Sequence, residues 1–258
     1  MTSTDPTLTT PTTVSTVGRR ARPQWVRAAA SMLSVHGVVG AWFWVGAVVL
    51  VTLATLVVDR FTTVRVSILQ YASYAMLWFP FSIAVVVAAV LTVYVANGMT
   101  RRSFIRGALA SSVVVALGYG LVMALLLLVE GWIYGALGWA HGAMGTDDDG
   151  IVEGIWESGL LAPWGVATLM VLAGLVSGLA VGAGYYRFGG LRGTVLLPFA
   201  LLPVLGAQVL IDLGRPDSVG HLAGLGDWVY PIVGAATLVL AAFVVAVLRR
   251  APIGGVEA

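Results

Sequence analysis

The sequence contains no cysteine and no lysine, and both absences exclude specific chemistry. Without cysteine there is no disulfide, no thiolate nucleophile, no zinc–thiolate centre and no lipid-modified cysteine. All 14 basic residues are arginine, so the chain cannot form a phosphate loop of the type G-x-x-x-x-G-K-[ST]. The sequence therefore predicts that the chain has no ATP site of this kind.

Charge is also scarce, because only 10% of the 258 residues are charged while 59% are hydrophobic. Soluble domains carry roughly 25% charged residues, so this composition indicates a membrane protein. Apolar runs such as "SIAVVVAAVLTVYVA" do not alternate in polarity, which favours helices over a barrel. We predict an all-α integral membrane protein with six transmembrane helices. The predicted spans are Val38–Val58, Leu77–Ala96, Ala108–Leu128, Pro163–Gly184, Thr194–Ile211 and Pro231–Leu248.

The arginines separate by side of the membrane. With a cytoplasmic N-terminus, eleven arginines fall in inside segments and only Arg60, Arg65 and Arg215 fall outside. This positive-inside bias predicts that both termini are cytoplasmic and that the protein is a multi-pass protein of the plasma membrane. Because the arginines follow the membrane sides, nucleic acid is not an expected partner, despite a pI of ≈ 9.1.

Four regions are expected along the chain. Residues 1–18 form a Thr/Ser/Pro-rich tail with little apolar surface to bury. Residues 19–37 fit an amphipathic helix, roughly Pro23–Val35, lying on the inner membrane surface, although a plain basic anchor fits equally well. Residues 38–250 hold the six spans, and 251–258 form a short cytoplasmic tail.

Two spans carry small residues at four-residue spacing, a pattern that allows close helix packing. They are Gly174, Gly178 and Gly182 in the fourth span, and Ser112, Ala116, Gly120 and Ala124 in the third. The stripe can serve packing within one bundle or a homodimer interface. Pro198 and Pro203 predict a kink or break in the fifth span.

The six predicted spans contain no Asp, Glu, Lys, Arg or His. This argues against a proton-coupled carrier, a voltage-gated channel and an intramembrane protease. We therefore predict no catalytic residue and no metal site. Two external groupings are weaker alternatives: His141 with Asp147, Asp148 and Asp149 as metal ligands, and His221 with Asp217, Ser218 and Asp227 as a catalytic group.

The segment "VANGMTRRSFIRG", Val95–Gly107, places a compact basic insert between two spans. Gly98 fits the position just after a helix end, and Thr100 fits the N-cap of a new short helix. Arg102 and Arg106 are four residues apart and share a face, while Phe104 and Ile105 offer an apolar surface. The insert can either anchor to lipid phosphates or contact a protein.

This insert, together with an interfacial helix before the first span, resembles the permease subunits of type 2 ABC transporters, an exporter-like class. The resemblance implies that the insert is a coupling helix on a separate ATPase subunit, which binds ATP and Mg²⁺. The implied contacts are Thr100, Arg101, Arg102, Ser103, Phe104 and Arg106, with Arg187 and Arg192 of "YYRFGGLRG" as a second contact.

The resemblance further implies that the chain is not itself an enzyme, and that it works as a homodimer or with a sister permease. The cargo stays open among small molecules, peptides and lipids. Two other functions remain as alternatives: a non-transporting membrane anchor or immunity protein, and an intramembrane enzyme using His141, His221 or Glu153.

Overall fold

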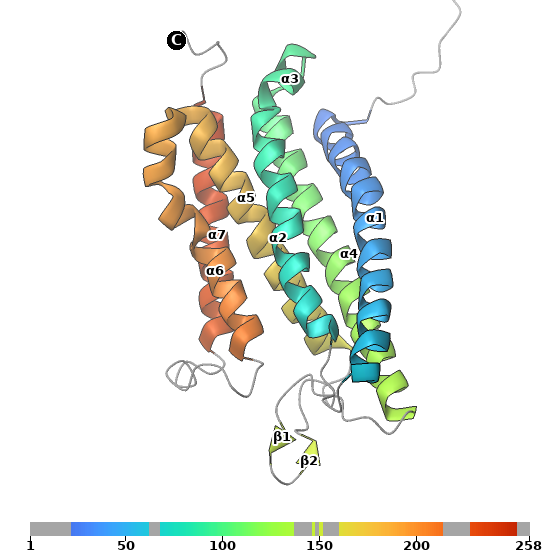
Figure 1. The fold of residues 1–258 in the computed structure, drawn as a ribbon. Coiled ribbons are helices and arrows are strands. Elements are labelled where there is room, and N and C mark those ends of the chain that lie inside the picture. The colour runs from blue at the N-terminus through green and yellow to red at the C-terminus, as the bar shows by residue number, and fades with distance from the viewer. Residues whose placement is uncertain are drawn as a thin grey trace, which may run out of the picture.

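The computed structural model describes residues 22–61, 68–136, 146–147, 150–151, 160–213 and 228–251. Seven helices and one antiparallel pair of two-residue strands occupy these ranges (Figure 1). They are α1 Gln24–Phe61, α2 Ile68–Ala89, α3 Leu91–Ala96, α4 Arg101–Ala136, β1 Thr146–Asp147, β2 Gly150–Ile151, α5 Leu161–Val195, α6 Leu197–Leu213 and α7 Val229–Arg249.

Five helices are long and apolar enough to cross a membrane, namely α1, α2, α4, α5 and α7. The shorter apolar helix α6 has 17 residues. The prediction of an all-α membrane protein is therefore confirmed at this level. The predicted tails 1–18 and 252–258 lie outside the described residues.

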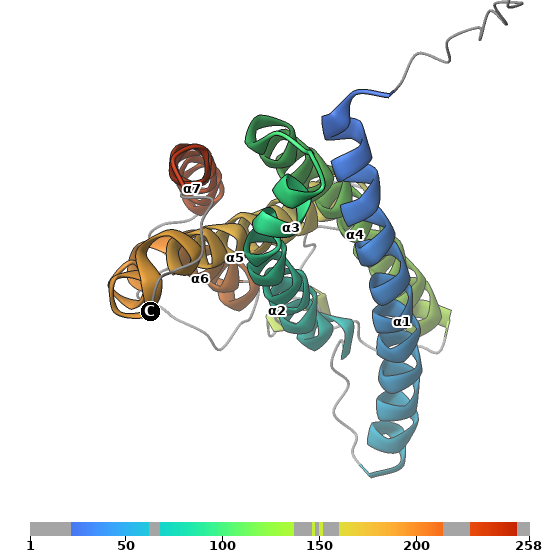
Figure 2. The same cartoon turned by 90° about the horizontal axis from the view of Figure 1, so that it is seen from above.

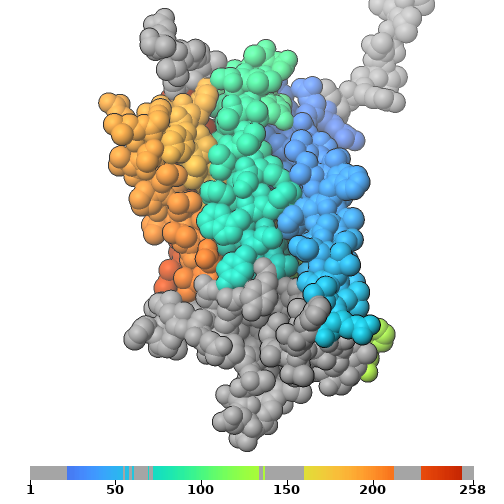
Figure 3. Space-filling model, viewed as in Figure 1, coloured from blue at the N-terminus to red at the C-terminus, as the bar shows by residue number. Residues whose placement is uncertain are grey.

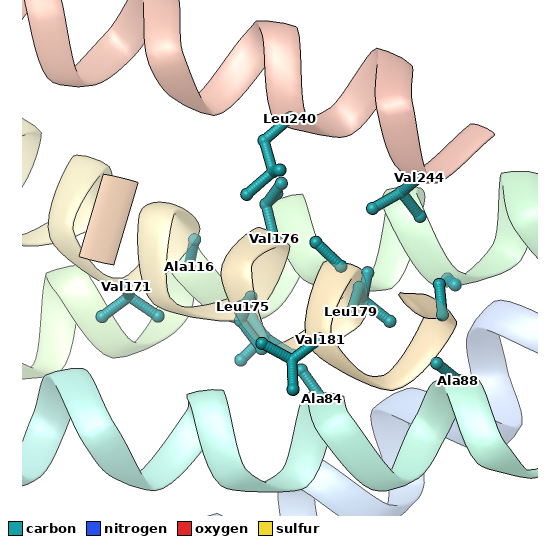
Figure 4. Packing of buried hydrophobic residues seen from close by; sticks show 14 of the residues in the cluster. Ala84, Ala88, Ala116, Val171, Leu175, Val176, Leu179, Val181, Leu240 and Val244 are labelled. Carbon is teal, nitrogen blue, oxygen red and sulfur yellow. The ribbon is translucent and has the colours of Figure 1, made fainter. Parts of the chain in front are cut away.

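Helix α5 is the central element of the bundle. In its most apolar stretch 78% of the residues are buried, compared with 6% for α1. Figure 2 shows α5 passing between α2, α4, α6 and α7, and Figure 4 shows its side chains beside those of α2, α4 and α7. Val176 and Leu179 lie near Leu240 and Val244 of α7, while Val181 faces Ala84 of α2. A helix surrounded by protein needs apolar residues on all sides, which explains why α5 has no polar face.

The glycine stripe of α5 packs against α2 of the same chain. A Cβ atom at Gly174 would lie 2.8 Å from the carbonyl oxygen of Leu77 in α2. A Cβ atom at Gly178 would overlap the carbonyl oxygen of Phe81, and one at Gly182 would overlap that of Val85. All three glycines are buried. The prediction of helix packing is confirmed. The dimer-interface alternative needs correction, because the bundle's own α2 already covers the stripe.

The stripe of small residues on α4 likewise packs within the chain. Ser112, Ala116, Gly120 and Ala124 are all buried. At Gly120 a Cβ atom would lie 2.8 Å from the backbone nitrogen of Thr168 in α5. Both stripes thus bring a neighbouring backbone close to α4 or α5, as small residues allow in membrane bundles.

Helix α1 is one continuous helix of 38 residues. Residues 24–37 of the predicted interfacial region and the predicted span beginning at Val38 are therefore parts of a single helix, which corrects the expected boundary. At 1.5 Å per residue α1 is about 57 Å long, well beyond a hydrocarbon core of ~30 Å. Figure 2 shows α1 and α4 lengthwise while α7 is seen nearly end-on, so both long helices are strongly tilted relative to α7.

The predicted fifth span is interrupted by a turn at Leu196, two residues before Pro198. Pro198 is the second residue of α6, where its missing N–H has no helical acceptor to lose, and Pro203 lies inside α6. A second change of direction, not predicted, lies at Gly189, whose φ of 75° favours glycine. Residues 190–195 are helical and lead into α6 through a turn at Leu196.

Charged residues are segregated between the two ends of the bundle. Of the described residues, nine arginines lie at the end that holds the start of α1 and the end of α7, and no acidic residue lies there (Figure 1). They are Arg22, Arg27, Arg101, Arg102, Arg106, Arg187, Arg192, Arg249 and Arg250. The opposite end holds Arg60 and the four acidic residues of the described ranges, Asp59, Glu130, Asp147 and Asp212. We call the first of these the arginine end.

Candidate functional site

The α3–α4 turn, residues 97–106, is the candidate site at the arginine end. It begins where α3 stops at Gly98, whose φ is 79°. The N–H of Gly98 donates to the Val95 oxygen at 3.0 Å, and the N–H of Met99 donates to the Tyr94 oxygen at 3.1 Å. These two bonds form a Schellman motif, which confirms the predicted role of Gly98.

Helix α4 starts with the predicted N-cap. The N–H of Ser103 donates to Thr100 Oγ1 at 3.2 Å, and the Thr100 hydroxyl donates to Ser103 Oγ at 2.9 Å. Helix α4 then continues without interruption for 36 residues. The turn is therefore a tight junction between α3 and a long helix, whereas a separate short helix was predicted.

The start of α1 holds this turn in place. The side-chain amide of Gln24 donates from Nε2 to the Gly98 oxygen at 3.5 Å and accepts from the Thr100 N–H at 3.3 Å. Ser31 Oγ lies 3.1 Å from the Tyr94 hydroxyl. One glutamine thus satisfies a donor and an acceptor of a backbone segment that has no helical partners there.

Replacing Gln24 by Ala should loosen this junction. Two backbone groups of the turn would lose their partner, at an expected cost of about 1 kcal/mol because water can replace it at an exposed site. Hydrogen–deuterium exchange in detergent should show faster exchange of the Thr100 amide. Ser34→Ala, an exposed change elsewhere on α1, is the control and should leave that amide unchanged; equal exchange in both variants would contradict the assignment.

One of the predicted partner contacts, Phe104, is a core residue, and so is its neighbour Ile105. Phe104 is fully buried, and its ring centroid lies 5.3 Å from that of Tyr94. Ile105 is 4% exposed. The prediction that Phe104 contacts a partner is therefore wrong for this conformation. Because α4 continues past the turn, its first apolar residues face the bundle and close the gap beside α3.

Two arginines of the predicted contacts bind the end of α7. Arg101 Nη1 donates to the Arg249 oxygen at 3.4 Å, and Arg187 Nη1 donates to the Val247 oxygen at 3.0 Å. The last carbonyl groups of a helix lack partners within it and carry partial negative charge. Arg101 and Arg187 therefore cap α7 and link it to α4 and α5.

The predicted second contact, "YYRFGGLRG", is a helical reversal around Gly189 and not the expected loop. Tyr185 Oη lies 3.0 Å from Thr194 Oγ1, which in turn donates to the Gly190 oxygen at 2.8 Å. Gly193 packs against the Tyr185 ring. Arg192 stays exposed beside this reversal.

The surface that remains open on the turn is polar. Its exposed residues are Asn97, Gly98, Thr100, Arg102 and Arg106, whereas Met99, Arg101 and Ser103 are half-buried, Met99 against the core. Neither Arg102 nor Arg106 has a hydrogen bond or ion pair with another described residue. Among the described residues, the turn is also the highest point of the arginine end in Figures 1 and 3.

A buried histidine, His36, and a buried glutamate, Glu130, lie inside the candidate spans and were not predicted from the sequence. His36 is 4% exposed, and its Nδ1 lies 2.9 Å from the Met32 oxygen while Tyr119 donates to the His36 oxygen at 3.2 Å. Glu130 is 7% exposed and accepts from the Leu69 N–H at 3.3 Å, at the start of α2. Both fell just outside the predicted spans because α1 and α4 extend beyond the apolar runs.

The alternative external sites are not tested by the structure. Asp147 is described only as part of β1. The other residues of these groupings lie outside the described residues, namely His141, Asp148, Asp149, Glu153, Asp217, Ser218, His221 and Asp227. Among the residues that are described, no group of three or more His, Cys, Asp or Glu side chains could hold a metal ion.

Comparison with models of known protein families, with curated proteins and with solved structures finds no match for this chain.

Proposed function

We propose that the chain is the transmembrane subunit of an exporter-like ABC transporter, driven by a separate ATPase that docks on the α3–α4 turn. The observation that carries the proposal is this turn. It projects from the arginine end, it is held rigidly by Gln24 and its own caps, and it leaves Arg102 and Arg106 open.

In this proposal the chain crosses the membrane six times. Five crossings are α1, α2, α4, α5 and α7, and the remaining one is the helical arm 190–213 after the reversal at Gly189. At 1.5 Å per residue α6 alone is about 26 Å long, close to a core of ~30 Å, and residues 190–195 extend the arm beyond the turn at Leu196. The arginine end faces the cytoplasm, since arginine is retained on that side.

The contacts around the turn suggest how a docked ATPase would act on the helices. Gln24 joins the turn to α1, and Arg101 joins the first turn of α4 to the end of α7. A displacement of the turn would therefore reach three spans at once. This fits a membrane subunit that has an inward-facing and an outward-facing state. A partner ATPase that binds one of the two states more tightly would shift the subunit toward that state. The permease needs no catalytic group for this task.

The proposal is tested by purifying the tagged chain from its native cells in mild detergent. We expect an ATPase with a phosphate-loop lysine to co-purify, and we expect Arg102→Ala/Arg106→Ala to reduce its yield severalfold. Arg60→Ala, an exposed arginine at the opposite end, is the matched control. Absence of any ATPase, under conditions that keep other membrane complexes intact, would contradict the proposal.

ATP hydrolysis by the purified complex separates transport from simple anchoring. If the chain is a transport subunit, substitutions in the α3–α4 turn should change the rate of ATP hydrolysis per bound ATPase. If the chain is only an anchor, the same substitutions should leave that rate unchanged. Pairing with a second copy or a sister permease remains a prediction of the same proposal. The mass of the purified complex shows whether it contains one membrane subunit or two.

A further inference from the structure

We infer that the partner surface that meets the α3–α4 turn is acidic, and that its carboxylates bind Arg102 and Arg106. This inference rests on the proposed function, because it specifies the chemistry of the docked ATPase. It starts from what the turn leaves exposed. With Phe104 and Ile105 in the core, the five exposed positions between 97 and 106 carry no large apolar side chain. A partner must therefore recognise polar and cationic groups.

The two open arginines stand in an unfavourable place within the chain. They lie in the first two turns of α4, where the helix dipole carries partial positive charge, and the first turn holds no acidic residue. A cation in the first turn, such as Arg102, is disfavoured by a few tenths of a kcal/mol, and Arg106 repels Arg102 by a similar amount because like charges four residues apart share a helix face. The positive charge of Arg101 is compensated within the chain, because its guanidinium group donates a hydrogen bond to the Arg249 oxygen. For Arg102 and Arg106, an anionic partner would supply the missing compensation.

Charge complementarity selects carboxylates as the binding groups. The planar guanidinium group matches a carboxylate through two parallel hydrogen bonds. No acidic residue lies at the arginine end among the described residues, so none of the described side chains there competes with a partner for Arg102 and Arg106. Arg22, Arg27 and Arg192 are also exposed at this end and add to its positive potential.

A protein surface fits better than lipid headgroups as the source of these carboxylates. The turn stands above the start of α1 and the ends of α5 and α7 (Figures 1 and 3). Its exposed side chains at the apex, Asn97 and Thr100, are polar, and Met99 between them is half-buried against the core, so the apex offers no fully exposed apolar side chain to a membrane surface. The partner is therefore placed on the aqueous side of the turn.

The test measures the affinity of the co-purifying ATPase for the full chain in lipid nanodiscs, with salt raised from about 50 to about 500 mM, which shortens the Debye length severalfold. We expect the Kd to rise about tenfold, as two exposed ion pairs would allow. Arg102→Glu/Arg106→Glu should weaken binding more than Arg102→Gln/Arg106→Gln, and Arg60→Glu should have no effect.

The outcomes separate the inference from the proposed function. If the ATPase binds equally well at all salt concentrations, and charge reversal matches neutralisation, the acidic partner surface is refuted while ATPase docking stands. If no ATPase binds in any condition, the proposed function itself fails. If charge reversal weakens binding only in nanodiscs with anionic phosphatidylglycerol, and not in phosphatidylcholine, the arginines act on headgroups and the inference is overturned.

Discussion

Phe104→Ala is expected to lower the free energy of unfolding of the isolated chain by about 3–5 kcal/mol, the range for removing a buried phenylalanine. The side chain is fully buried and packs beside Tyr94, so its loss leaves a cavity between α3 and α4. Denaturant titration of the purified chain in detergent, without any partner present, measures this cost directly.

Arg102→Ala in the same turn is the matched control for this prediction. Its side chain is exposed, so the isolated chain should keep its stability within about 0.5 kcal/mol. The two variants should therefore separate folding from docking: Phe104→Ala changes stability, and Arg102→Ala changes partner binding. If Phe104→Ala left stability intact and only reduced ATPase binding, Phe104 would be an interface residue after all.

Gly178→Ala should also destabilise the protein, by about 1–3 kcal/mol, as overpacking of a tight contact does. The added methyl group would overlap the Phe81 carbonyl oxygen and lie 2.8 Å from the Ala84 Cβ atom. The obstacle is backbone, which cannot rotate away, so α2 and α5 would have to separate. The same denaturant titration reports the change.

Gly165→Ala provides the control on the same helix. Gly165 is exposed, and an added Cβ atom would meet no atom within 4 Å. Alanine favours helix over glycine by about 1 kcal/mol, so this variant should be as stable as the parent or slightly more stable. Similar losses in both variants would mean that the α2–α5 contact is looser than described.

Much of this architecture follows from local rules that the sequence displays openly. The scarcity of charge predicts membrane helices, and the arginine positions predict which helix ends lie together. Gly98 and Thr100 predict the junction between α3 and α4, because a helix end needs a left-handed residue and a helix start needs a side-chain acceptor. The hydrogen bonds at both residues confirm these predictions.

Other features depend on contacts between distant segments, which no local pattern determines. The four-residue spacing of Gly174, Gly178 and Gly182 predicts a close helix neighbour but does not identify it as α2. Phe104 is apolar both in a core and in an interface, and only the uninterrupted course of α4 assigns it to the core. Arg101 and Arg187 cap α7 because the fold brings its end beside them.

The apolar pattern of the sequence also did not predict where the membrane-spanning helices begin and end. Helix α1 begins at Gln24, because Ala28 and Met32 pack within the bundle before the long apolar run starts. His36 therefore becomes a buried residue of a candidate span. Hydropathy marks the lipid-facing part of a helix, whereas packing decides how far the helix continues.

The most direct test of the account places a single thiol on the turn. Because the chain has no cysteine, Thr100→Cys carries the only reactive position, and a photo-crosslinker attached there reports what the turn touches in native membrane vesicles. The account predicts an adduct with an ATPase chain that contains a phosphate-loop lysine, formed from the cytoplasmic face only. An adduct with lipid alone, or labelling from the outer face of intact cells, would contradict it.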